Sequence, residues 1–330
     1  MNQNQRSHQP FDAVLIVSFG GPQGPQDVRP FLDNILRGRP APPGRVEAIV
    51  ANYMRYNGIS PITEITRRQA TGVRKRLAEA GVELPVYIGM RNWHPYLSDV
   101  MAEMSRAGVR QAIGFITAAH HSYASCGQYK ENVREARRRL REQGLSDVDV
   151  TYVASWYDHP SFIGTLAQHV QDAIERLEPR LQERARIVFT AHSIPVSMAE
   201  SCQYREQLQT TARMVAGKLG CHDWALVYQS RSGRPQDPWL GPDINEYLKA
   251  EREKGLEAVV ISPIGFICDH IEVLCDLDVK VGDLCRNIGL PMARAETVND
   301  DPVFLDMMTE VISRTVVRYA RFQPLPVTSR

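Results

Sequence analysis

The chain has 330 residues, of which 43% are hydrophobic, and its 39 Lys and Arg nearly balance its 38 Asp and Glu to give a formal net charge of +1. This balance excludes the strongly basic composition of nucleic-acid-binding domains, and we expect no nucleic-acid partner. The length predicts two domains with a substantial core.

No targeting or membrane segment is evident in the sequence. The first ten residues are polar, and no run of about 18 apolar residues predicts a transmembrane helix. We therefore expect a cytoplasmic protein. Its six cysteines are spread along the chain, which favours free thiols or metal ligands over disulfides. The basic run 137–141 has acidic neighbours and is typical of a solvated helix face.

Short apolar, β-branched runs alternate along the chain with longer amphipathic segments. The predicted strands are Ala13–Ser18, Pro85–Gly89, Ala112–Thr117, Val148–Ala154, Ala185–Phe189, Ala225–Tyr228 and Ala258–Ser262. The predicted helices are Gln26–Leu36, Thr63–Ala80, Tyr96–Ala107, Gln128–Glu142, Ser161–Leu177, Tyr204–Leu219, Ile244–Lys254 and Pro302–Tyr319. This alternation predicts an α/β fold in which helices cover both faces of parallel sheets.

Three loops at strand ends are candidates for ligand contact. Gly20-Gly21-Pro22 follows the first strand, but neither common phosphate-binding glycine motif is present, so a tight turn or close backbone approach to a ligand competes with a nucleotide site. The loop Gly89–Pro95 contains Trp93 and His94, which either contact a ligand or cap the next helix. The long loop Tyr228–Asp243 is rich in Pro and Gly, and ordered loops of this length tend to be functional.

A histidine stands at the end of one predicted strand. In Phe189–Pro195 an apolar segment leads directly to His192, with a proline three residues later. Ligands of open α/β sheets gather outside the carboxyl ends of the strands. The sequence therefore indicates a functional His192, and a hydrogen-bonded structural histidine is the alternative.

A second strand end carries acids and a histidine. Val259–Glu272 places Asp269, His270 and Glu272 just after an apolar strand. The alternative is a helix start in which Asp269 caps and Glu272 completes a capping-box-like arrangement. Imidazole and carboxylate groups at two sheet ends predict a site that binds a borderline metal ion or moves protons.

Seven stretches, in this order along the chain, resemble the ferrochelatase family, whose members insert ferrous iron into a porphyrin. They are Ser18–Pro22, Asn57–Pro61, Gly89–Pro95, Ser155–Asp158, Thr190–Pro195, Pro238–Asp243 and Gly265–Leu274. The resemblance covers about residues 11–320 and implies two Rossmann-like domains, each with a four-stranded parallel sheet flanked by helices. It implies a first domain of residues 1–117 plus a returning 300–330, a second domain of 118–299, and a porphyrin cleft between them.

The resemblance also implies roles for individual residues. His192 matches the family's catalytic histidine, the metal ligand and proton acceptor, and Glu272 matches its partner carboxylate, so both would handle the Fe²⁺ substrate. The expected porphyrin-binding residues are Phe19, Arg37, Tyr53, Ser60 and Tyr129, with Arg37 and Tyr53 near the propionates. At the position of Phe19 several relatives carry a tyrosine, and a phenylalanine there excludes tyrosinate ligation of iron.

The resemblance implies no cofactor for catalysis itself, but it raises the question of a [2Fe–2S] cluster. Ser125–Tyr129 is similar to the segment that supplies one cluster ligand, Cys126, in some members. The C-terminal cysteine motif that supplies the other three ligands is absent here. Cys268, Cys275 and Cys285 are the candidate replacements, and inert thiols are the alternative.

The expected partners are a porphyrin, Fe²⁺ and, transiently, neighbouring enzymes of the haem pathway. Ser18–Pro25 and Asn57–Pro61 are similar to the actinobacterial-type enzymes, which favours coproporphyrin III over protoporphyrin IX as the substrate. The alternatives are a chelatase for another metal or tetrapyrrole, a non-catalytic haem or metal carrier, and a nucleotide-dependent enzyme.

Overall fold

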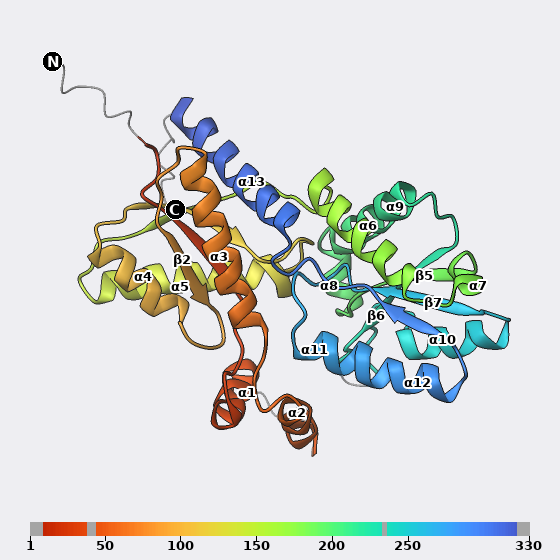
Figure 1. The fold of residues 1–330 in the computed structure, drawn as a ribbon. Coiled ribbons are helices and arrows are strands. Elements are labelled where there is room, and N and C mark those ends of the chain that lie inside the picture. The colour runs from red at the N-terminus through yellow and green to blue at the C-terminus, as the bar shows by residue number, and fades with distance from the viewer. Residues whose placement is uncertain (1–8, 38–43, 233–235, 322–330) are drawn as a thin grey trace.

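The computed structural model describes residues 9–37, 44–232 and 236–321 (Figure 1). The polar residues 1–8 and the tail 322–330, which we expected to belong to the first domain, lie outside these ranges. The described strands form two separate four-stranded sheets. We call each sheet with the helices that cover it a lobe.

The first sheet has the strand order β2-β1-β3-β4, and the pairs within it are parallel. Its strands are β1 (Ala13–Ser18), β2 (Val86–Met90), β3 (Gln111–Ile116) and β4 (Asp149–Tyr152). The second sheet repeats this pattern in the order β6-β5-β7-β8, again with parallel pairs. Its strands are β5 (Ala185–His192), β6 (Trp224–Gln229), β7 (Ala258–Ser262) and β8 (Met292–Arg294).

Helices connect and cover these strands. In the first lobe they are α1 (Val28–Leu36), α2 (Arg45–Met54), α3 (Ile62–Glu79), α4 (Leu97–Arg106) and α5 (Gln128–Glu142), with a 3-10 turn η1 (Pro25–Asp27) and a π-helical turn η2 (Tyr123–Gly127). In the second lobe they are α6 (Pro160–Glu175), α7 (Pro179–Gln182), α8 (Val196–Glu200), α9 (Tyr204–Lys218), α10 (Ile244–Glu253), α11 (Ile271–Val273), the π-helix η3 (Leu274–Val281) and α12 (Gly282–Asn287). The last helix is α13 (Pro302–Arg321).

The apolar run of β1 is explained by burial of both faces of its sheet. Val14 and Ile16 belong to one core cluster, together with residues of α3, whereas Leu15 and Val17 belong to another, with residues of α4 and α5. Side chains alternate between the two faces of a strand, so a strand covered on both sides reads as continuously apolar.

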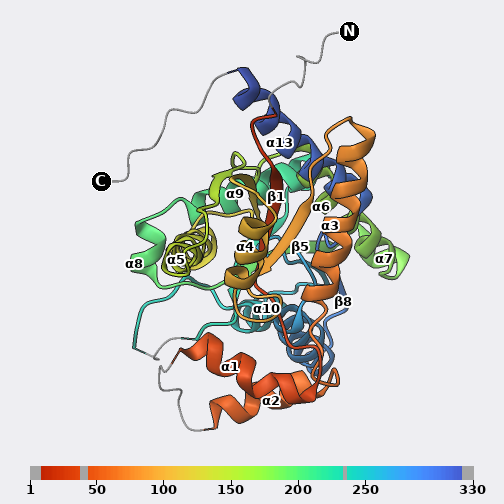
Figure 2. The same ribbon diagram turned by 90° about the vertical axis from the view of Figure 1, so that its left-hand side faces the viewer.

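The two lobes share one core cluster. The cluster that contains Ile16 also contains Phe162 of α6, Phe189 of β5 and Phe304 of α13. Helix α13 packs against both α3 and α6, and Figures 1 and 2 show it running beside α3 from one lobe toward the other. The C-terminal helix therefore joins the lobes.

The predicted parallel α/β fold is confirmed, and all seven predicted strands are present. Strand β5 continues beyond the predicted end at Phe189, because Thr190 and His192 pair with Val227 and Gln229 of β6. Several elements were not predicted: the helices α2, α7 and α8, the π-helical turn η2, the edge strand β8 and the helical stretch 271–287. A strand of three residues is too short to show alternation, and a π-helix does not follow the 3.6-residue period.

The sheets divide the chain later than the expected domain boundary at residue 117. Strand β4 pairs with β3 through Gln111↔Asp149 and Gly114↔Tyr152. Strand β4 and helix α5, which packs on α4, therefore complete the first lobe before the chain crosses to α6. The turn before α5 also contacts the second lobe, because His120 bonds to Thr211 of α9.

Candidate functional site

His192 and Phe19 occupy equivalent places in the two sheets. His192 ends β5, whose two neighbours are β6 and β7, and Phe19 directly follows β1, whose neighbours are β2 and β3. In each sheet the strand order reverses at this strand, and such a switch point is where open α/β sheets bind ligands. The fold thus places one candidate residue at each switch point.

The hydrogen bonds of His192 determine which ring nitrogen is free. Nδ1 lies 2.5 Å from the carbonyl oxygen of Ser193, and a carbonyl oxygen can only accept, so Nδ1 carries the proton. The Nε2 atom of the neutral ring then keeps its lone pair, which is available to a proton or a metal ion. The backbone is also held, since the hydroxyl of Tyr204 donates to the carbonyl oxygen of His192 at 3.0 Å.

His270 links His192 to Glu272. Its Nδ1 caps α11 by accepting a hydrogen bond of 3.1 Å from the backbone N–H of Glu272, so the proton of the neutral ring lies on Nε2. Desolvation lowers the pKa of His270; the charges of Glu272 and Asp269 oppose this shift and His192 reinforces it. Both His192 and Glu272 therefore lie within electrostatic reach of one imidazole, and the Glu272 side chain itself is exposed.

Tyr53, on α2 of the first lobe, packs against the segment that carries Glu272. It is 8% exposed, and burial, followed by the charges of Glu272 and Cys275, raises its pKa. The cluster around it contains Val28, Phe31, Leu32, Trp93, Ile271 and Cys275. Residues of α1 and α2 thus contact α11 and η3 across the gap between the lobes.

Phe19 packs at the meeting point of three clusters. Its ring lies 6.3 Å from that of Phe31 in an edge-on arrangement. A phenyl ring carries no donor atom for a metal ion, so Phe19 offers only apolar surface at its switch point.

Ser60 is buried against the glycine turn after β1. Its backbone N–H donates to the carbonyl oxygen of Pro22 at 2.9 Å, and a Cβ atom added to Gly21 would lie 2.5 Å from the Cβ of Ser60. Only glycine fits at residue 21, because real Cβ contacts are not this short. The turn serves close packing against Ser60 rather than phosphate binding.

Arg91 lies close both to Tyr129 and to a cavity that Arg37 lines. Tyr129 begins α5 and is buried, and the guanidinium carbon of Arg91 lies 5.9 Å from its ring centroid. Arg37, which is exposed, ends α1 in a left-handed conformation with φ of 47°. Both arginines line a cavity of about 430 Å³, together with Asp33, Asn34, Tyr96, Ser98, Asp99 and Arg139.

Arg91 is a residue that sequence reasoning missed. The signal was present, because Arg91 lies in the loop Gly89–Pro95 that we singled out for Trp93 and His94. Three guanidinium groups, those of Arg37, Arg91 and Arg139, line this cavity against the two carboxylates of Asp33 and Asp99, and such groups are suited to carboxylate ligands.

The four candidate cluster cysteines lie in different surroundings. The Sγ of Cys126 lies 2.6 Å from Nδ1 of His121, and Cys268 packs with Ile62 and Ile65. Cys275 belongs to the cluster of Tyr53, and Cys285, on α12, packs in the core with residues of α10. Across residues 9–37, 44–232 and 236–321, no three His, Cys, Asp or Glu side chains are grouped to hold a metal ion. This arrangement does not fit a four-cysteine cluster.

Among the helices in the described ranges, none is long and apolar enough to cross a membrane.

Comparison with known proteins gave one family and several similar proteins. The family model described as Ferrochelatase matches residues 11–316. A protein named Coproporphyrin III ferrochelatase from Nocardia farcinica is 42% identical over 309 residues, which cover 91% of this chain and 87% of that protein. A protein of the same name from Mycolicibacterium smegmatis is 41% identical, with coverage of 92% and 89%, and a Ferrochelatase from Rhodopirellula baltica is 41% identical, with coverage of 92% and 86%.

Solved structures are similar in fold at low sequence identity. The sirohydrochlorin chelatase SirB from Bacillus subtilis in complex with cobalt has a TM-score of 0.55 and 10% identity, with coverage of 94% of this chain and 97% of that one. DR2241 from Deinococcus radiodurans has a TM-score of 0.53 and 12% identity, with coverage of 91% and 54%. These similarities support the arrangement of two parallel sheets.

Proposed function

Because this chain belongs to the ferrochelatase family and is a metal-inserting enzyme of haem biosynthesis, we propose that it inserts Fe²⁺ into coproporphyrin III with His192 and Glu272 as its catalytic residues. The observation that carries the proposal is the free Nε2 of His192 at the switch point of the second sheet. His270, within electrostatic reach of both proposed catalytic residues, adds support.

The reaction requires two proton acceptors. Two pyrrole N–H protons leave as Fe²⁺ enters the macrocycle, so the charge of the porphyrin does not change. The Nε2 lone pair of His192 accepts one proton, and the carboxylate of Glu272 accepts the other. A mixed nitrogen and oxygen environment binds Fe²⁺ weakly enough to release it.

The macrocycle lies, in this proposal, between the two lobes. Phe19 supplies apolar surface at the first switch point, and Tyr53, Ser60 and Tyr129 line the first-lobe side. A cleft that binds a buckled porphyrin more tightly than a flat one turns the pyrrole nitrogens toward the incoming ion and lowers the barrier.

Carboxylate recognition favours coproporphyrin III, which has four carboxylates where protoporphyrin IX has two. Arg37 and Arg91 beside one cavity supply cations for such groups. The relatives named Coproporphyrin III ferrochelatase, at about 40% identity, point the same way.

The decisive assay measures Fe²⁺ insertion into coproporphyrin III and protoporphyrin IX side by side. We expect kcat/KM to be at least about tenfold higher for coproporphyrin III, equivalent to roughly 1.4 kcal/mol of transition-state binding. Equal or reversed values would contradict the substrate assignment. Faster turnover with Co²⁺ or Ni²⁺ would favour another chelatase activity, and stoichiometric binding without turnover would favour a carrier.

The His192→Ala variant tests the catalytic assignment. We expect insertion to fall by about a hundredfold or more, while coproporphyrin III still quenches the protein's tryptophan fluorescence with an unchanged midpoint. Near-normal turnover by this variant would remove His192 from the mechanism.

We also propose that no resident cofactor takes part, because the cysteines do not form a cluster site. Absorbance spectra and iron and sulfide analysis of anaerobically purified protein test this, and a visible cluster spectrum would contradict it. A cytoplasmic location and transient contacts with neighbouring haem-pathway enzymes remain parts of the proposal, to be tested by cell fractionation and cross-linking.

For the domains, we propose a boundary between β4 and α6, near residue 153, with α13 returning to the first lobe. The pairing of β4 with β3 supports this position. Limited proteolysis with cleavage first in residues 153–159 is the expected result.

A further inference from the structure

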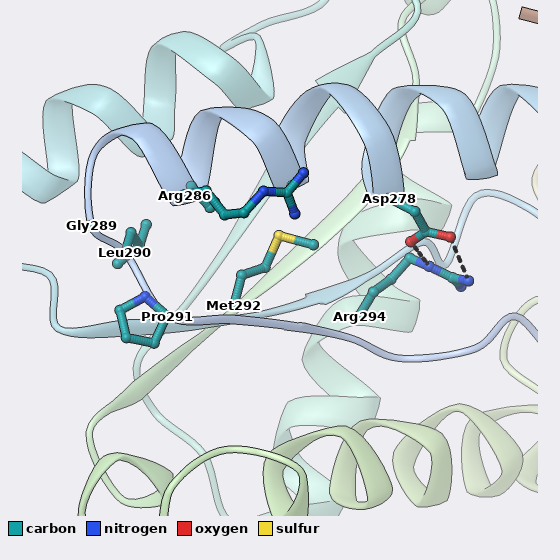
Figure 3. Close-up of a pocket in the computed structure, with 9 residues that line it drawn as sticks. Asp278, Arg286, Gly289, Leu290, Pro291, Met292 and Arg294 are labelled. Carbon is teal, nitrogen blue, oxygen red and sulfur yellow. Dashed lines mark hydrogen bonds and ion pairs between the residues drawn. The ribbon is translucent and has the colours of Figure 1, made fainter.

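Arg294 is a buried arginine at the end of the edge strand β8. Its side chain is 13% exposed and binds two carboxylates: Nε and Nη2 donate to the two oxygens of Asp278, and Nη1 donates to Oδ1 of Asp269 at 2.9 Å. Figure 3 shows the paired contact with Asp278, with Arg294 beside a cavity of about 520 Å³ that Met292 and Arg286 also line. We call Arg294, Asp269 and Asp278 the Arg294 clamp.

The two carboxylates of the clamp bracket Glu272 in the sequence. Asp269 stands immediately before His270, and Asp278 lies in the middle of η3. One guanidinium therefore fixes both ends of the ten-residue segment that carries His270 and Glu272.

The Asp269 end of the segment is fixed further by Asn299. The side chain of Asn299 accepts from the backbone N–H of Asp269 at 2.9 Å and donates to its Oδ2 at 3.1 Å. The carbonyl oxygen of Asn299 accepts from Gln69 of α3 at 2.5 Å. Asp269 is thus held both by β8 and, through Asn299, by the first lobe.

The Asp278 end belongs to a helix that is tied to both edges of the second sheet. On one side Asp278 binds Arg294 of β8, and on the other Asp276 binds Ser230, which follows β6. Strands β6 and β8 are the two edge strands. A π-helix has poorer internal geometry than an α-helix, so side-chain ties of this kind determine where it lies.

We propose that Arg294 is a positioning residue for metal insertion, which holds Glu272 and His270 in register with His192 without touching the porphyrin or the metal ion. This inference rests on the proposed function. Lysine is a poor replacement for the arginine, because its compact ammonium lacks the planar fork of donors that reaches both oxygens of Asp278 and one of Asp269. Misplacement of a catalytic group by about 1 Å is enough to cost on the order of a hundredfold in rate.

The test begins with kinetics of Arg294→Lys and of a matched control, Arg286→Lys. Arg286 lines the same cavity, but its ion pair among the described residues is with the exposed Asp283 three residues earlier. For Arg294→Lys we expect kcat for Fe²⁺ insertion to fall about tenfold to a hundredfold, with the KM for coproporphyrin III within twofold of the parent. For Arg286→Lys we expect both constants to be unchanged.

A double-variant cycle separates positioning from a general loss of structure. Introduced into Glu272→Gln, the Arg294→Lys change should lower kcat by less than about twofold, because the group it positions is already disabled. If the two effects multiply instead, or if Arg294→Lys raises KM and leaves kcat unchanged, the proposal is overturned. If Glu272→Gln alone has no effect on kcat, the proposed role of Glu272 fails. The double-variant cycle is then repeated with His270→Ala in place of Glu272→Gln, to measure whether Arg294→Lys acts through His270.

If Arg294→Lys does not fold, Asp278→Asn replaces it, since this variant keeps the pair of Arg294 with Asp269. The expected result is a smaller fall in kcat with unchanged KM. A kcat equal to that of the parent in a folded Asp278→Asn would overturn the proposal.

Discussion

The hydroxyl of Tyr204 donates a hydrogen bond of 3.0 Å to the main-chain carbonyl oxygen of His192. Tyr204 is 5% exposed and comes from α9, so a helix covering the sheet fixes the last residue of its central strand. Together with the bond from Nδ1 of His192 to the carbonyl oxygen of Ser193, this contact holds the residue whose Nε2 carries the free lone pair.

Removal of the Tyr204 hydroxyl should lower catalysis without weakening porphyrin binding. In Tyr204→Phe the carbonyl oxygen of His192 loses its partner, and we expect about 1 kcal/mol less stability and a several-fold lower kcat at unchanged KM. The control is Tyr247→Phe, whose hydroxyl accepts from Arg186 at the opposite end of β5. A fall in kcat of equal size in both variants would show that the Tyr204 contact has no special role.

Neutralisation of Glu272 should act on the chemical step. For Glu272→Gln we expect a fall in kcat of about a hundredfold or more, because an amide cannot accept a pyrrole proton, with at most a twofold change in the KM for porphyrin. Glu246→Gln, an exposed acid on α10, is the matched control and should behave as the parent. An effect of Glu272→Gln confined to KM would assign this residue to substrate binding.

A methyl group at residue 21 should disturb the porphyrin side of the first lobe. In Gly21→Ala the new Cβ would lie 2.5 Å from that of Ser60, so Ser60 must move, at a cost of about 1–3 kcal/mol. We expect a lower melting temperature and a several-fold higher KM for coproporphyrin III. Gly217→Ala is the control, since this helical glycine has nothing within 4 Å of its added Cβ, and it should be neutral or stabilising.

His120 should make the protein sensitive to acid. Its Nε2 lies 3.0 Å from the hydroxyl oxygen of Thr211, and that hydroxyl donates its one proton to the carbonyl oxygen of Tyr157. Nε2 must therefore carry the ring proton. The buried Nδ1 has no hydrogen-bond partner among the described residues, and desolvation lowers the pKa of His120 from 6.5 to about 3.

Because the pKa of His120 is lowered in the folded protein, acid should destabilise the fold. Between pH 6.5 and 3 the unfolded chain binds a proton at His120 that the folded protein does not, so stability falls as the pH falls, by at most about 5 kcal/mol. His120→Gln, which keeps a donor for Thr211, should flatten the decrease of melting temperature between pH 6.5 and 4.5. Exposed His222→Gln is the control, and parallel curves for His120→Gln and the parent would refute the prediction.

The strand ends of the candidate site were predictable from the sequence, whereas the contacts that orient them were not. Apolar runs that stop at His192 and before Asp269 mark the carboxyl ends of buried strands, so local pattern was enough to select these positions. Arg91 contacts Tyr129 and Arg294 contacts Asp269. These partners are distant in sequence, so the local pattern of apolar and polar residues does not predict the contacts.

The same limit explains why the sheet to which residues 149–152 belong was not predicted. The run Val148–Ala154 was recognised as a strand, but the sheet to which it belongs is set by long-range pairing with β3. The π-helix η3 was missed because Asp276 and Asp278 anchor it from two edges of a sheet, which is a tertiary effect that overrides local propensity.

Helix α13 has a mechanical consequence for the enzyme. The backbone passes from one lobe to the other twice, after β4 and after β8, and α13 then packs on α3 and α6. Two crossings and a common core resist a hinge-like opening, so the lobes behave as a fixed frame. We therefore expect the movement that admits the porphyrin and releases the product to arise in the peripheral helices α1 and α2, which project from the two lobes at the bottom of Figure 1.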